Sequence, residues 1–94
     1  MSEEQHLITR FPGSNINVIV KRPFLVEITP TNDGYVAISS ISNIYELGAT
    51  KKIAISNYCK SLVDELIWLQ KHEQELSDSI YQELRILQDY IEVV

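Results

Sequence analysis

The apolar residues of this chain change their spacing at Gly48-Ala49-Thr50, and that change limits the folds open to it. Before this point they follow the alternation of β-strands, and after it they recur every three or four residues, as on one face of an α-helix. Thr50 is a suitable N-cap, because its hydroxyl can accept a hydrogen bond from an unpaired amide in the first helical turn. The pattern therefore predicts an α+β fold in which strands come first and helices follow.

The strand half of the chain predicts an antiparallel β-meander within residues 16–47. Residues 24–28 alternate as a half-buried strand, and Asp33-Gly34 is typical of a hairpin turn. Residues 35–39 then return antiparallel, and residues 44–47 form the next strand.

Two segments near the N-terminus decide how large this sheet is. Residues 16–20 are rich in β-branched side chains and are the candidate for a further strand, so we expect three or four strands. Residues 1–14 begin with polar side chains and contain the turn-forming Pro12-Gly13-Ser14, which predicts an N-terminal arm outside the sheet.

The helical half predicts a long helix over residues 50–72, laid across one face of the sheet. Its apolar stripe consists of Ile55, Tyr58, Cys59, Leu62, Leu66 and Leu69. Trp68 falls beside this stripe, where it can either cap the core or protrude as an interface anchor.

A second helix is predicted over residues 77–92, beginning at Ser77 or alternatively at Ser79. Its apolar stripe, Ile80, Leu84, Leu87, Ile91 and Val94, is widened by Tyr81, Ile86, Tyr90 and Val93. A short helix with so wide an apolar surface is expected to bury a second side, either folded back as a helical hairpin or paired across a two-fold axis. The candidate interface residues are Trp68, Tyr81, Ile86, Tyr90 and Val93.

Size and composition predict one small domain. The chain has 94 residues, 45% of them hydrophobic, and a formal net charge of −5. No stretch is apolar enough for a membrane helix, and the Met-Ser-Glu-Glu start lacks the features of a signal peptide. The lone Cys59 allows no internal disulfide, so we expect a cytoplasmic protein.

The residues that could support catalysis or metal binding are scattered. His6 and His72 lie far apart, Cys59 falls on an apolar stripe, and Asp64 and Glu65 flank that stripe as solvated residues do. We therefore expect no catalytic residues, no metal site, no cofactor and no enzymatic activity.

Basic residues are few. Lys21, Arg22, Lys51 and Lys52 form a basic patch if the first strand lies near the start of the long helix, and are otherwise ordinary solvated surface. Direct binding of nucleic acid is not expected, because phosphate contacts need a clustered basic face.

The run from Phe24 to Thr50, with Asp33-Gly34-Tyr35 and Gly48-Ala49-Thr50 as its short motifs, resembles the N-terminal domain of HicB-like antitoxins. The similarity covers about residues 24–70. It implies a β-β-β-α unit related to a truncated RNase H fold. It also implies a partner, a small basic ribonuclease toxin of the HicA type, whose active site the domain would occlude. Members of that family commonly carry a C-terminal DNA-binding segment, whereas residues 77–94 contain Arg85 as their only basic residue.

Two functions remain as hypotheses from the sequence. The first is a non-catalytic protein-binding module that neutralises a small basic toxin. The second is a stand-alone homo-oligomerising or adaptor protein with no toxin partner. Both predict apolar surface that this chain does not cover by itself.

Overall fold

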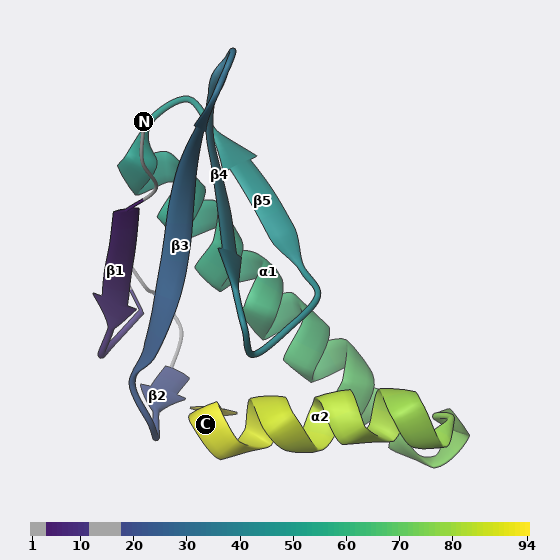
Figure 1. Cartoon of the computed structure of the whole chain (residues 1–94). Helices are drawn as coiled ribbons and strands as arrows, with labels where there is room; N and C mark the ends of the chain where they lie inside the picture. The colour runs from purple at the N-terminus through teal and green to yellow at the C-terminus, as the bar shows by residue number, and fades with distance from the viewer. Residues whose placement is uncertain (1–3, 12–17) are drawn as a thin grey trace.

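A computed structural model describes residues 4–11 and 18–94 and confirms the α+β fold, with an antiparallel sheet, a long helix and a second helix (Figure 1). The elements are β1 (Glu4–Ile8), β2 (Val18–Val20), β3 (Phe24–Thr31), β4 (Gly34–Ser39), β5 (Tyr45–Gly48), α1 (Lys51–Lys71), the 3-10 turn η1 (Glu73–Glu75), α2 (Asp78–Tyr90) and β6 (Ile91–Val93).

The main sheet has four antiparallel strands in the order β1-β3-β4-β5. The predicted hairpin joins β3 to β4, with Thr31 opposite Gly34. Gly34 has a φ of +153°, and a Cβ there would collide with the backbone of Gly48, so the turn requires glycine. The β3-β4-β5 meander is therefore the one that the alternation of apolar residues predicted.

The fourth strand of this sheet is not the one proposed from the sequence. Residues 4–8, expected in the N-terminal arm, form β1 and pair with β3. Val18–Val20 joins no main-sheet strand and instead pairs with β6 in a separate two-stranded sheet, while residues 16 and 17 and the Pro12-Gly13-Ser14 turn lie outside the described residues. An edge strand tolerates polar residues, and in β1 only Ile8 is buried, so composition did not reveal it.

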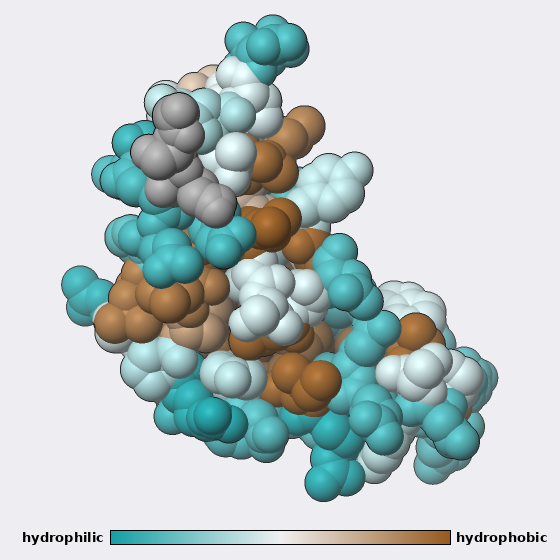
Figure 2. Space-filling view, in the orientation of Figure 1, coloured by the Kyte–Doolittle hydropathy of each residue, from teal (hydrophilic) through white to brown (hydrophobic). Residues whose placement is uncertain are grey.

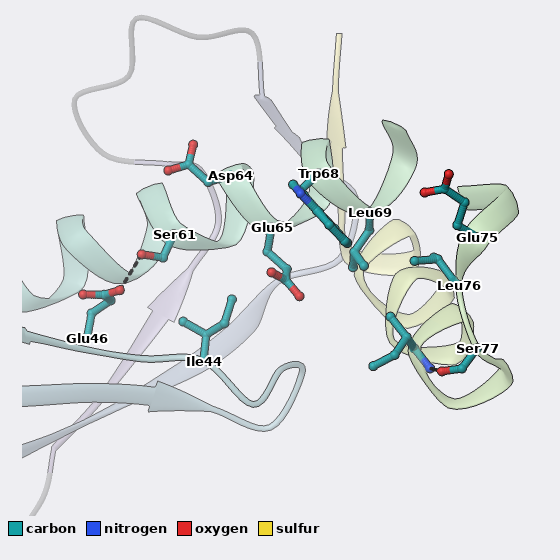
Figure 3. A pocket seen from close by; sticks show the side chains of 11 residues that line it. Ile44, Glu46, Ser61, Asp64, Glu65, Trp68, Leu69, Glu75, Leu76 and Ser77 are labelled. Atoms are coloured by element: carbon teal, nitrogen blue, oxygen red, sulfur yellow. Dashed lines mark hydrogen bonds between the residues drawn. The ribbon is translucent and has the colours of Figure 1, made fainter. Parts of the chain in front are cut away.

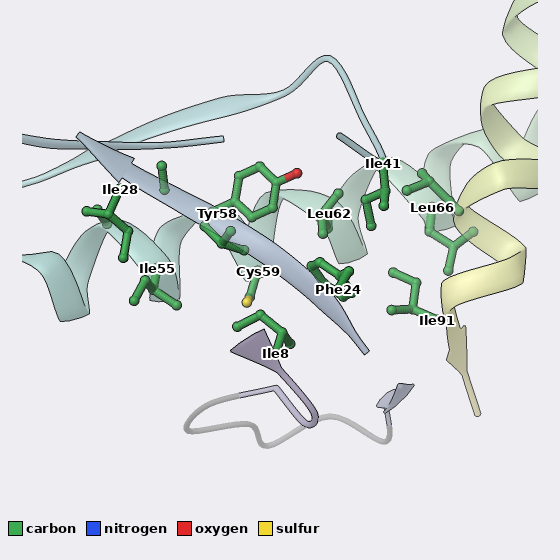
Figure 4. Packing of buried hydrophobic residues seen from close by; sticks show 14 of the residues in the cluster. Ile8, Phe24, Ile28, Ile41, Ile55, Tyr58, Cys59, Leu62, Leu66 and Ile91 are labelled. Atoms are coloured by element: carbon green, nitrogen blue, oxygen red, sulfur yellow. The ribbon is translucent and has the colours of Figure 1, made fainter. Parts of the chain in front are cut away.

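The long helix α1 lies behind the sheet in Figure 1 and covers its inner face. Thr50 caps it as predicted, because its hydroxyl accepts a hydrogen bond from the Ile53 amide at 3.1 Å. The buried core between the two layers includes Ile8, Phe24, Ile28, Ile55, Tyr58, Cys59, Leu62 and Leu66 (Figure 4). The Tyr58 hydroxyl is satisfied within this core by Ser39 at 2.5 Å and Ser42 at 2.9 Å.

The second helix begins with Ser77 as its N-cap, and its hydroxyl accepts from the Ile80 amide at 3.4 Å. It ends at Tyr90, two residues before the predicted end, because residues 91–93 become extended and pair with β2. This pairing holds α2 across the end of α1 at a steep angle, so the chain forms no helical hairpin (Figure 1).

We expect Gly48→Ala to destabilise the protein by roughly 1–3 kcal/mol. A Cβ on Gly48 would lie 2.7 Å from Ala54 Cα and 2.8 Å from the Ile53 carbonyl carbon, both of which are backbone atoms that cannot move aside. At positions that accept a Cβ, replacing Gly by Ala stabilises a protein because it lowers the conformational entropy of the unfolded chain. A loss of stability here would therefore be due to the contact with Ile53 and Ala54. Urea denaturation followed by circular dichroism measures it. The exposed Ala49→Ser is the matched control, and a Gly48→Ala protein as stable as that control would contradict the prediction.

Candidate protein interaction surfaces

The face of the main sheet that points away from α1 carries large exposed apolar side chains. In β3 and β4 strand alternation places them there, because the neighbouring Phe24, Val26 and Ala37 fill the core. We call this surface the outer sheet face and define it by Leu7, Leu25, Ile38, Tyr45 and Leu47, whose exposed fractions run from 39% to 64%. Figure 2, which views this side of the molecule, shows apolar side chains gathered over the strands.

The pairing register joins these side chains into neighbouring pairs. Leu7 lies opposite Leu25, and Ile38 lies opposite Tyr45. Cross-strand partners stand about 5 Å apart, so each pair presents a continuous apolar surface. Glu27 is the only formally charged residue that strand alternation places among them in β1, β3, β4 and β5. Exposed apolar patches of this kind mark interaction surfaces in monomeric proteins.

A second surface lies at the β5 edge of the main sheet, in the corner between β5, α1 and the start of α2 (Figure 3). It is an open groove of about 810 Å³ that we call the acidic groove. Its lining residues are Ile44, Glu46, Ser61, Asp64, Glu65, Trp68, Leu69, Glu75, Leu76, Ser77 and Ile80. Apolar side chains and four carboxylates line it together, and we call the apolar lining its floor and the carboxylates its rim.

Trp68 lines this groove and is 53% exposed. Its ring stacks on His72 with 4.1 Å between centroids, and His72 Nδ1 lies 2.9 Å from the Trp68 carbonyl oxygen. The structure thus places Trp68 on the surface rather than as a cap on the core, in an orientation fixed by its neighbour. His72 is accounted for by this stacking, and His6 lies apart from it on the edge strand β1.

The other candidate interface residues do not form one surface. Tyr81, Tyr90 and Val93 are half-buried and pack against the core, and only Ile86 is exposed, at 44%. The core, β2 and β6 therefore cover most of the apolar surface that the second helix was expected to offer a partner. The uncovered apolar surface lies instead on the outer sheet face, which the candidate interface residues did not include. Its signal was present in Phe24-Leu25-Val26, where apolar residues occupy both faces of one strand.

The two basic pairs lie at opposite ends of β3, so they do not form a patch. Lys21 Nζ donates to the Gln88 carbonyl oxygen at 2.6 Å, and the Arg22 guanidinium lies 4.7 Å from the centre of the Tyr90 ring. Lys51 forms an ion pair with Glu4, and Glu4 lies opposite Ile28 toward the other end of β3. Lys52 is exposed to solvent. These contacts hold the N- and C-terminal segments in place rather than creating a binding site.

The candidate chemical groups also stay apart. Within residues 4–11 and 18–94, no three His, Cys, Asp or Glu side chains converge as metal ligands would. Glu27 lies on the outer sheet face, whereas Asp64 and Glu65 line the acidic groove. Burial raises the pKa of the Cys59 thiol to about 12, and burial also raises the pKa of Tyr58 despite its hydrogen bonds to Ser39 and Ser42.

Comparisons of the chain with protein-family models, curated proteins and solved structures find no match. None of the helices in the described part of the chain has both the length and the apolar character that crossing a bilayer requires.

We expect Cys59 in the folded protein to resist thiol reagents at pH 8 and to react at once in denaturant. The side chain is 2% exposed and, with a pKa of about 12, carries almost no thiolate at that pH. Reaction with a chromogenic disulfide, with and without urea, measures this. Rapid labelling of the folded protein would contradict it.

The raised pKa of the Cys59 thiol also determines how the stability of the protein should change with pH. An unfolded thiol ionises near 9.0 while the folded one ionises near 12, so the free energy of unfolding should fall as pH rises between these values. Urea denaturation from pH 8 to 11 should show a smaller fall for Cys59→Ala than for the parent protein. Tyr58 shifts in the same direction, so the variant should keep part of the dependence.

Proposed function

We propose that this protein is a non-catalytic protein-binding module that engages its partner through the outer sheet face. The observation that carries the proposal is the set of five large apolar side chains left exposed on one side of a sheet whose other side packs against α1. Covering an apolar surface is favourable by roughly 25 cal/mol per Å², so a partner that fits it gains binding energy directly.

A protein fits this surface better than a nucleic acid or an anionic membrane does. The chain carries a net charge of −5, and no lysine or arginine lies among the residues that define the outer sheet face. Phosphate-bearing partners require basic contacts, whereas the core of a protein interface is depleted in charged residues.

We infer that the partner is a small basic protein, and the first candidate is a ribonuclease toxin of the HicA type. Support comes from the resemblance of residues 24–70 to HicB-like antitoxins and from the acidic balance of the chain, which accelerates encounter with a basic partner. The lone cysteine agrees with action in the cytoplasm. Antitoxins are encoded beside their toxins, so a short basic reading frame next to this gene should yield a product that co-purifies with the protein. Without such a neighbour, the toxin hypothesis fails.

The second candidate is self-association of the same face. Glu27 is the only formal charge that strand alternation places there, so two copies can pack face to face with little charge repulsion. Size-exclusion chromatography with light scattering separates the two candidates, because self-association gives a dimer or larger species from the purified chain alone. A monomer at high concentration leaves the heterologous partner.

We expect Leu25→Lys to weaken association, with the toxin or with a second copy, by at least about 30-fold, the effect of losing one interface hot spot of about 2 kcal/mol. Leu25 is 46% exposed, so the folded protein should lose little stability. Lysine also places a positive charge opposite a basic partner or opposite its own copy. Calorimetry or light scattering measures the effect.

Ile86→Lys is the matched control, because Ile86 is equally exposed at 44% but lies on α2. The proposal expects it to bind like the parent protein. If Ile86→Lys abolished association and Leu25→Lys did not, the interface would lie on the C-terminal helix and the outer sheet face would be excluded.

A further inference from the structure

We propose that the acidic groove binds a basic amphipathic segment of a partner protein, with apolar side chains on the floor and Lys or Arg side chains at the rim. The inference rests on the proposed function in taking the ligand to be a protein. It uses a different surface, however, because none of the residues that line the groove belongs to the set that defines the outer sheet face.

The floor of the groove is apolar and already formed. Leu69 is buried at its base, and Ile44, Leu76 and Ile80 stand half-buried around it (Figure 3). They come from four separate parts of the chain: the segment before β5, α1, the α1–α2 connection and α2. The Ser77 cap of α2 and the packing of these residues against the core hold them in place. A partner would therefore bind without ordering the groove first, which avoids an entropic cost.

The rim carries negative charge that the chain itself does not neutralise. Glu46, Asp64, Glu65 and Glu75 line the groove, and no lysine or arginine lines it. Within the described part of the chain, the one ion pair is that of Lys51 with Glu4, at the far end of α1. Four carboxylates around one apolar floor complement a ligand that is apolar in the middle and cationic at its edges.

Trp68 adds a second contact for a cation. One face of its indole ring is covered by the His72 ring, and the side chain remains 53% exposed. Lys and Arg side chains are attracted to the face of a tryptophan ring, and Trp is the best of the aromatic residues for this contact. Because Asp64 and Glu65 line the same groove as Trp68, a cation above the ring would also be near carboxylates.

The same features exclude the other ligand classes. Nucleic acid and anionic lipid headgroups would meet carboxylates of like charge at the rim. A small polyamine would satisfy the rim but would leave the apolar floor exposed. Only a segment carrying both apolar and basic side chains uses both parts of the groove, which is the helix-in-groove mode of recognition.

The test uses the full chain and a defined probe, a Leu/Lys amphipathic peptide of about 14 residues. Trp68 is the sole tryptophan, so intrinsic fluorescence reports the groove directly. We expect the peptide to shift the tryptophan emission to shorter wavelength as the indole is covered, with binding that weakens as salt is added. A peptide with Glu in place of Lys, and a Lys-rich peptide without Leu, should bind at least tenfold more weakly.

Neutralising the rim separates the groove from the overall charge of the protein. The triple variant Asp64→Asn, Glu65→Gln, Glu75→Gln should bind the Leu/Lys peptide about tenfold more weakly. The control triple variant Asp33→Asn, Asp89→Asn, Glu92→Gln removes the same charge from exposed positions outside the groove and should bind like the parent. Circular dichroism verifies that both variants are folded.

Three results would overturn the inference. One is an unchanged emission with peptide up to about 1 mM. Another is an equal loss in the two triple variants, which would indicate attraction to overall charge alone. The third is loss of peptide binding in Leu25→Lys, which would place the peptide on the outer sheet face. The proposed function has a separate test. It fails if Leu25→Lys associates with the partner as strongly as the parent protein does, and this result does not depend on whether the peptide binds.

Discussion

Packing of α1 against the inner face of the sheet is the interaction on which the other parts of the structure depend. Val26 and Ala37 from the strands meet Tyr58, Leu62 and Leu66 from the helix, and all five side chains are fully buried. Burial of a large apolar side chain contributes about 1.5–3 kcal/mol, so this layer dominates the stability of so small a chain. The Tyr58 hydroxyl enters the layer at little cost because Ser39 and Ser42, at the end of β4 and just after it, are its hydrogen-bond partners.

The pairing of β2 with β6 explains where uncovered apolar surface does and does not occur. It holds the C-terminal segment against the start of β3, where the Lys21 and Arg22 amides both donate to the Tyr90 carbonyl oxygen. As a result Leu84, Leu87 and Ile91 close the end of the core. The large apolar residues that remain uncovered are therefore on the outer face of the sheet. A two-layer fold with one long helix covers only one of the two sheet faces.

The sequence predicted well what local chemistry decides. The hairpin at Gly34, the cap at Thr50 and the stripe of α1 each follow from residues close together in the chain. It predicted poorly what long-range pairing decides. The polar segment 4–8 becomes a strand only because β3 offers it an open edge, and residues 18–20 pair with residues more than seventy positions away. The acidic groove could not be predicted from the sequence for the same reason. Ile44, Trp68 and Leu76 come together only because α2 turns across the end of α1.

The outer sheet face and the acidic groove share no residue but adjoin at the edge strand β5, and this arrangement bears on how a partner is held. Ile44 and Glu46 of the groove flank Tyr45 of the outer sheet face, so the two surfaces meet along β5. One partner with a basic tail could engage the apolar face with its body and the groove with that tail. Its second contact would then be intramolecular, and a short flexible link raises the effective concentration of such a contact to the millimolar range. Weak binding at each surface would thereby give tight binding overall. This is relevant to a chain of 94 residues, because neither surface on so small a protein can be large.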